Sequence, residues 1–133
     1  MSETRFAVEH LGLAARDPQA LKEWCRTVLE AKVVFESGQT PPAFLLELPG
    51  GLLLEVYAAD FALPKTADNK LAGWRHVALR VERIESAREA LAKKGVVFQE
   101  PVKPAGGGGR VLFFQDPEGN LWHLVERPKG SAT

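Results

Sequence analysis

The chain has 133 residues, of which 45% are hydrophobic and 26% are charged, and its 17 basic and 17 acidic residues give a formal net charge of zero. This is the composition of one globular domain with a substantial core, without the basic excess that binds nucleic acid or an anionic membrane. The composition therefore predicts a small-molecule partner or a second copy of the chain.

A cytoplasmic location is expected from what the sequence lacks. No apolar run approaches the roughly 18 residues of a membrane span. Residues 1–5 lack the apolar region of a signal peptide. The single cysteine, Cys25, cannot form a disulfide within the chain, which agrees with a reducing compartment.

The first half of the chain predicts a strand, a helix and three more strands. Ala7 to Ala15 is the first strand, and Asp17-Pro18 begins a helix with an N-cap and a proline at the first helical position. Apolar residues at helical spacing extend this helix to about Ala31. The later strands are predicted at Val33–Glu36, Phe44–Leu48 and Leu52–Ala58, with a glycine turn between the last two.

The second half repeats this order after a linker at 60–72. A strand is predicted at His76–Glu82 and a helix at Glu85–Lys94, which Gly95 ends. The last three strands are predicted at Val96–Gln99, Arg110–Gln115 and Leu121–Arg127, with a loop at Gly106–Gly109. The predicted fold class is therefore α+β, with two βαβββ modules at about 5–59 and 73–128 in one domain over residues 1–133.

Particular residues repeat along with the elements. Glu9-His10-Leu11-Gly12-Leu13 matches Arg75-His76-Val77-Ala78-Leu79, 66 positions later, and the segment that ends at Glu55 matches the one that ends at His123, 68 positions later. All three histidines of the chain fall on these positions. A pseudo-twofold axis between the halves would bring His10, Glu55, His76 and His123 to one point, where a divalent metal can bind.

These motifs resemble the vicinal oxygen chelate superfamily, which includes glyoxalase I, bleomycin-resistance proteins and extradiol dioxygenases. Glu9-His10-Leu11-Gly12-Leu13 is similar to its opening module, Gly73-Trp74-Arg75-His76-Val77-Ala78 to the start of its second module, and Asp116-Pro117-Glu118-Gly119-Asn120-Leu121-Trp122 to its closing hairpin. The resemblance implies an open, cup-shaped mixed sheet built from two βαβββ modules, a divalent metal in the cup, a small-molecule substrate and a homodimer.

The resemblance also implies which residues bind the metal. The family's ligands come from the first and last strands of each module, and they fall on His10, Glu55, His76 and His123. The position of His123 usually holds a glutamate, so this chain departs from the two-acid glyoxalase pattern. Glu126, three residues further along the strand, should point to the opposite face and is ranked below His123 as a ligand.

Three functions fit this set of residues. A divalent metal polarises a carbonyl and stabilises an enediolate, with Glu55 as the base, in a lyase or isomerase of the glyoxalase type. An Fe(II)-dependent ring-cleaving dioxygenase and a metal-free binding or resistance protein are the alternatives. Three imidazoles and a carboxylate suit zinc, nickel, cobalt, iron or manganese, so the sequence does not select the metal.

Overall fold

The computed structural model describes residues 5–61 and 67–129. The chain divides into two compact units, Met1–Ala62 and Leu63–Thr133, which we call module 1 and module 2. Of the predicted linker at 60–72, residues 62–66 lie outside the described part of the chain.

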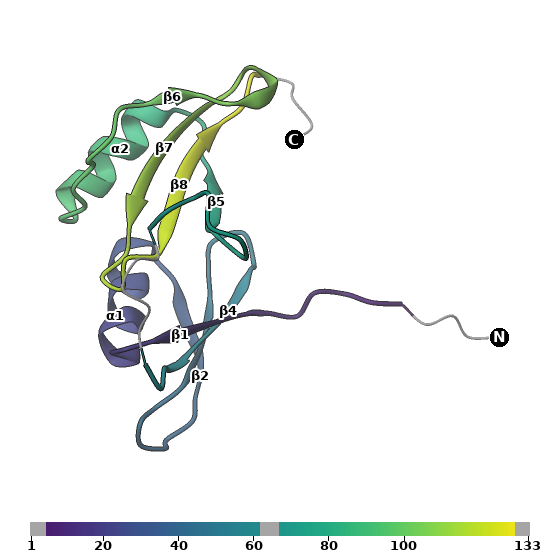
Figure 1. Ribbon diagram of the computed structural model, residues 1–133, viewed down its shortest axis with the longest axis vertical. Helices are drawn as coiled ribbons and strands as arrows, with labels where there is room; N and C mark the ends of the chain where they lie inside the picture. The colour runs from purple at the N-terminus through teal and green to yellow at the C-terminus, as the bar shows by residue number, and fades with distance from the viewer. Residues whose placement is uncertain (1–4, 62–66, 130–133) are drawn as a thin grey trace. The chain divides into compact units, whose positions relative to one another are not determined.

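Module 1 consists of a strand, a helix and three further strands (Figure 1). They are β1 (Leu11–Ala15), α1 (Pro18–Val28), β2 (Lys32–Glu36), β3 (Phe44–Glu47) and β4 (Leu53–Ala58). The sheet has the order β1-β4-β3-β2, in which β1 is parallel to β4 and the other neighbours are antiparallel. The module is therefore a βαβββ unit whose first and last strands are neighbours.

Module 2 has the same order and the same sheet topology. Its elements are β5 (His76–Arg80), α2 (Ile84–Lys93), β6 (Lys103–Pro104), a short 3-10 turn at Gly106–Gly108, β7 (Arg110–Gln115) and β8 (Leu121–Glu126). Its sheet has the order β5-β8-β7-β6, with β5 parallel to β8. The α+β class and the two βαβββ modules are thereby confirmed.

Each helix packs on one face of its own sheet and leaves the other face for the predicted ligands. The side chain of Asp17 accepts a hydrogen bond from the Ala20 backbone N–H at 3.0 Å, which begins α1 as predicted. Leu21 and Cys25 of α1 are fully buried, as is Val56 of β4. In β5 the residues alternate, so that His76 and Ala78 are exposed while Val77 is partly covered.

The two helices end differently in sequence but alike in backbone. Both continue into a residue with positive φ, which is Glu30 after α1 (φ 61°) and Gly95 after α2 (φ 95°). A left-handed conformation favours glycine, because a side chain there crowds the backbone. Glu30 therefore adopts a conformation that Gly95 takes without strain.

The strand predicted at Val96–Gln99 is wrong, because β6 instead lies at Lys103–Pro104. The N–H of Val96 donates to the Leu91 carbonyl at 3.1 Å, and the ring of Phe98 packs edge-on against Phe114 at 5.8 Å. This segment therefore ends the helix and covers the core instead of pairing. β6 pairs Lys103 with Val111 and Pro104 with Arg110, and the Ala105 N–H donates to the Gly109 carbonyl at 2.8 Å, where the hairpin closes.

The first strand is shorter than predicted and begins at Leu11, so that His10 lies immediately before it. Its partner β4 begins at Leu53, directly after the turn, and the first register pair is Leu11 with Leu54. Continued backwards, this parallel register places His10 opposite Leu53, the first residue of β4, and residues 7–9 beyond the start of β4.

Neither of the two described helices is long and apolar enough to span a lipid bilayer, judged on residues 5–61 and 67–129.

Candidate metal-binding site

Module 1 brings its two predicted ligands together. His10 lies just before β1 and Glu55 lies in the neighbouring strand β4, and the His10 Nε2 is 3.7 Å from the Glu55 Oε1. On the other side of the ring, the Nδ1–H of His10 donates to the Glu9 carboxylate at 2.9 Å. Both side chains of the pair are partly exposed, with 37% of His10 and 44% of Glu55 accessible to solvent.

Gly12 keeps room for this pair. A Cβ atom at Gly12 would lie 3.3 Å from the Tyr57 ring and 3.9 Å from the Glu55 carboxylate. Gly12 is opposite Glu55 in the parallel register of β1 and β4. The glycine of the Glu9-His10-Leu11-Gly12 motif therefore lets Tyr57 and Glu55 lie over the strand beside His10.

Module 2 also brings its two predicted ligands together. His76 begins β5 and His123 lies in the neighbouring strand β8, and their ring centroids are 4.5 Å apart. The Nδ1–H of His76 donates to the Asn69 side-chain oxygen at 2.7 Å. The Nδ1–H of His123 donates to the Leu124 backbone carbonyl at 3.1 Å.

His123 is much less accessible than the pair in module 1, with only 7% of the residue exposed. Burial, with a smaller contribution from the nearby His76 and Arg127, lowers the pKa of His123. A histidine whose pKa lies below its usual range is neutral at neutral pH. A neutral imidazole is the form that binds a metal.

The three histidines share one arrangement of hydrogen bonds. In each, Nδ1 has an oxygen acceptor: a carboxylate at His10, an amide at His76 and a backbone carbonyl at His123. In a neutral imidazole, a proton on Nδ1 leaves Nε2 unprotonated. Metal-binding histidines usually hold their second nitrogen in this way, which fixes the tautomer and the orientation of the ring.

The residues therefore suit a divalent metal. The His10 Nε2 and the Glu55 Oε1 face each other at 3.7 Å, and imidazole nitrogen and carboxylate oxygen are both atoms that bind a divalent metal. A divalent ion in module 1 would be held by His10 and Glu55 together. Among the described residues no group of three or more histidine, cysteine or acidic side chains is gathered at one place, since each module contributes one pair.

Glu126 lies against the start of α2 and Arg110. Its carboxylate accepts a hydrogen bond from the Ile84 N–H at the start of α2 (2.9 Å) and two from Arg110 (both 3.0 Å). Arg110 also donates to Glu85 at 2.6 and 2.9 Å. The Ile84 N–H and then Arg110 lower the pKa of Glu126, and Arg110 lowers the pKa of Glu85 to about 2. Glu126 thus faces the helix, on the side opposite His123, as predicted.

Sequence reasoning missed two residues beside the module 2 pair. Asn69 lies in the predicted linker, and nothing in its immediate sequence indicates that its oxygen meets His76. Phe113 lies opposite His123 in the antiparallel register of β7 and β8, and its ring centroid is 4.8 Å from His123 and 5.7 Å from His76. The strand register could have identified Phe113, because opposed residues share a face.

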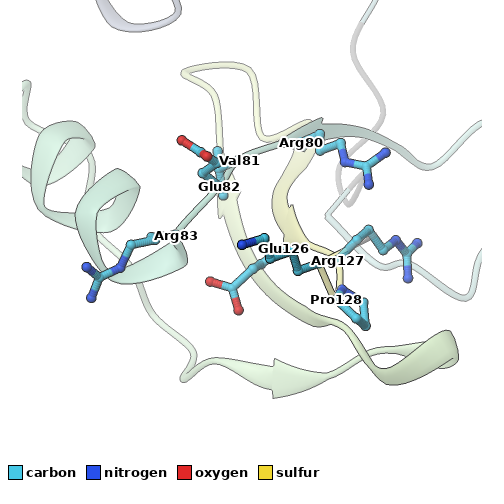
Figure 2. A pocket seen from close by; sticks show the side chains of 8 residues that line it. Arg80, Val81, Glu82, Arg83, Glu126, Arg127 and Pro128 are labelled. Atoms are coloured by element: carbon cyan, nitrogen blue, oxygen red, sulfur yellow. The ribbon is translucent and has the colours of Figure 1, made fainter. Parts of the chain in front are cut away.

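An open pocket of about 850 Å³ lies at the ends of β5 and β8 in module 2 (Figure 2). Its lining is Arg80, Val81, Glu82, Arg83, Glu126, Arg127, Pro128 and Lys129. Arg80 and Arg127 extend to one side of the strands, while Arg83 and Glu126 extend to the other (Figure 2). Of these lining residues, the sequence suggested only Glu126 as a candidate ligand, ranked below His123.

Comparison with known families gives one match over most of the chain. The model described as "Glyoxalase/Bleomycin resistance protein/Dioxygenase superfamily" matches residues 7–124. This range contains both histidine-containing pairs. No match was found among curated protein sequences.

Solved structures give similar folds over nearly the whole chain. A glyoxylase/bleomycin resistance protein/dioxygenase domain from Frankia sp. EAN1pec is 25% identical, with a TM-score of 0.74 and 96% of each chain covered. A glyoxalase family protein from Enterococcus faecalis is 27% identical, with a TM-score of 0.76, 90% of this chain and 97% of that chain covered. The fosfomycin resistance protein FosX from Listeria monocytogenes, complexed with Mn(II) and 1S,2S-dihydroxypropylphosphonic acid, is 19% identical (TM-score 0.70; 95% and 94% covered) and shares the fold.

Proposed function

Because the chain belongs to the Glyoxalase/Bleomycin resistance protein/Dioxygenase superfamily, we propose that it is a divalent-metal-dependent lyase or isomerase of the glyoxalase type. Its substrate is a small molecule with two neighbouring oxygen atoms that chelate the metal. His10 and Glu55 from module 1 and His76 and His123 from module 2 are the proposed ligands. The two modules then work as one domain, in a cytoplasmic homodimer.

One observation supports the ligand set most strongly: all three histidines place Nδ1 on an oxygen acceptor. Three unrelated acceptors, from Glu9, Asn69 and the Leu124 backbone, produce the same tautomer. A structural histidine adopts whichever tautomer its hydrogen-bond partners require. A histidine that binds a metal through Nε2 does need this one, because Nε2 must offer its lone pair.

Glu55 is the proposed base. When bound, the metal supplies Lewis-acid polarisation of a substrate carbonyl, which acidifies the neighbouring C–H. The Glu55 carboxylate is 44% exposed and lies beside His10, so it has room to turn toward a substrate and accept that proton. Tyr57, two residues along the same face, is 39% exposed and borders the same space. The buried His123 is suited to holding its position rather than moving a proton.

Hydrogen–deuterium exchange tests the proposed chemistry directly. The protein loaded in turn with Mn(II), Zn(II), Ni(II), Co(II) and Fe(II) is incubated in D₂O with a panel of α-hydroxycarbonyl compounds. The expected result is deuterium incorporation next to the carbonyl, reduced roughly 100-fold or more in Glu55→Gln, a loss typical of a general base. The matched control is Glu47→Gln, a glutamate in the adjacent strand β3.

Other outcomes select the alternatives. Oxygen consumption with catechols, dependent on Fe(II), would identify a ring-cleaving dioxygenase. Saturable binding of small apolar molecules without metal, unchanged in Glu55→Gln, would identify a binding or resistance protein. Either result would overturn the lyase or isomerase proposal.

A further inference from the structure

The pocket at the ends of β5 and β8 carries an excess of positive charge. Four of its lining residues are basic and two are acidic, whereas the whole chain has a formal net charge of zero. One of the two acids, Glu126, already accepts hydrogen bonds from Arg110, which is not part of the lining. A concave surface lined mainly by one sign of charge concentrates ligands of the opposite sign.

Two of the basic residues lie on the same face of the sheet as the histidine pair. Along β5, His76, Ala78 and Arg80 are the exposed positions of an alternating pattern. Ala78 is opposite His123 in the parallel register of β5 and β8. Side chains of opposed residues point the same way, so Arg80 shares the face of both histidines.

Arg127 reaches this face from the other strand. It follows β8 directly and lies four residues after His123, so the period-2 alternation places both on one side. Arg80 and Arg127 extend to the same side, whereas Glu126 points away from them (Figure 2). The alternation and the picture therefore agree.

The glycine run of the sequence holds Arg127 in place. The Arg127 Nη1 donates to the Gly106 carbonyl at 2.7 Å. A Cβ at Gly109 would lie 2.5 Å from the Glu126 backbone oxygen and 3.3 Å from the Arg127 Nη1, so only glycine allows this approach. The glycines between β6 and β7 thus orient the guanidinium of Arg127.

We propose that Arg80 and Arg127 bind an anionic group of the substrate, either a carboxylate or a phosphate or phosphonate. This inference rests on the proposed function, because it assigns the far end of the molecule whose oxygen atoms bind the metal. Two guanidinium groups recognise such anions through paired hydrogen bonds. Each arginine lies four residues from a histidine in the same strand, roughly 13 Å at about 3.3 Å per residue. The substrate is therefore elongated, with the chelating oxygens at one end and the negative charge at the other.

An NMR titration of the full-length protein tests the anion site without knowledge of the substrate. Inorganic phosphate and, separately, acetate are added at constant ionic strength while the arginine Nε–H signals are recorded. Saturable shifts should be confined to Arg80 and Arg127, and the preferred anion distinguishes phosphate from carboxylate chemistry. In the Arg80→Gln/Arg127→Gln double variant the dissociation constant should rise at least 10-fold.

Arg83→Gln is the matched control, because Arg83 lines the same pocket but extends to the other side (Figure 2). Its phosphate affinity should stay within 2-fold of the parent protein. Equal shifts at all arginines, or an unchanged affinity in the double variant, would overturn the anion site. Metal content measured on the same samples separates the two proposals: site-specific phosphate binding by a protein that holds no metal would support the anion site and overturn the metal site.

Discussion

The last hairpins of the two modules have the same backbone but are stabilised by different means. The Leu48 N–H donates to the Leu52 carbonyl at 2.8 Å in module 1, and the Asp116 N–H donates to the Asn120 carbonyl at 3.1 Å in module 2. Leu48 is a buried apolar residue. Asp116 instead accepts side-chain hydrogen bonds from the Glu118 and Asn120 backbone N–H groups, the Asn120 side chain and the Trp122 indole. The same hairpin is thus stabilised by apolar packing in module 1 and by a network of hydrogen bonds in module 2.

The same contrast extends to the paired ligands that these hairpins carry. Glu55 in module 1 is a partly exposed carboxylate beside His10, whereas its repeat equivalent His123 is a buried imidazole beside His76. The hairpin with the polar network thus precedes the more buried of the two side chains. This difference agrees with the proposed roles, in which Glu55 accepts a proton and His123 holds its position.

The largest predicted effects concern the residues that orient the histidines. Glu9→Ala and Asn69→Ala remove the Nδ1 acceptors of His10 and His76, and each should weaken metal binding by about 10–100-fold. Glu9→Ala should have the greater effect, because a carboxylate is a stronger hydrogen-bond acceptor than an amide oxygen. Competition with a chromophoric chelator measures both affinities.

Glu89→Ala is the control for this pair of variants, since Glu89 lies on the exposed surface of α2 with 71% of its side chain accessible. If both variants bind metal as tightly as Glu89→Ala, the Nδ1 hydrogen bonds have no role in a metal site.

Trp122→Phe tests the polar network of the module 2 hairpin. Trp122 is 1% exposed and its indole N–H donates to Asp116 at 3.0 Å. Losing a hydrogen bond to a buried carboxylate should lower the free energy of unfolding by about 1–3 kcal/mol. Urea denaturation measures the change.

An Asp116→Asn background provides the matching double-mutant cycle. There the additional effect of Trp122→Phe should be smaller, because the charged acceptor is already gone. A full effect in that background would mean that Trp122 stabilises the hairpin by packing alone.

Opposite substitutions at the two residues with positive φ, Glu30 after α1 and Gly95 after α2, test the account of the helix ends. Glu30→Gly should stabilise the protein by about 1 kcal/mol, because a side chain in the left-handed region is strained. Gly95→Ala should destabilise it by about the same amount, since Gly95 has φ 95°. Thermal unfolding of both variants is the measurement, and changes of the same sign would contradict this account of the helix ends.

The smallest predicted effect concerns acid stability in module 2. In the folded state the Ile84 N–H and Arg110 lower the pKa of Glu126. Arg110 also lowers the pKa of Glu85 to about 2. Folding therefore gains stability from these groups above about pH 4.5, and that gain is lost as the pH falls toward 2. Arg110→Gln should make the free energy of unfolding depend less on pH between pH 4.5 and pH 2. An unchanged pH dependence would show that the ion pairs of Arg110 with Glu85 and Glu126 contribute nothing to stability.

Most of the elements and the two side-chain pairs were predictable because the chain repeats itself. The placement of His76 beside His123 and of His10 beside Glu55 follows from strand alternation and a shared topology. The β6 strand was not predictable in this way, because Val96–Gln99 has a strand composition but lies where the chain leaves α2. Contacts that depend on loop geometry were also missed, such as Asn69 on His76 and the glycine run on Arg127.

Elemental analysis of untagged protein purified without chelators, alongside His123→Ala, tests the central claim most directly. The account predicts about one equivalent of a divalent transition metal in the parent protein and its loss in the variant. Glu126→Ala should keep the metal, because Glu126 caps α2 on the opposite face. A parent protein without metal after reconstitution, or a variant that loses metal only at Glu126, would contradict the proposed site.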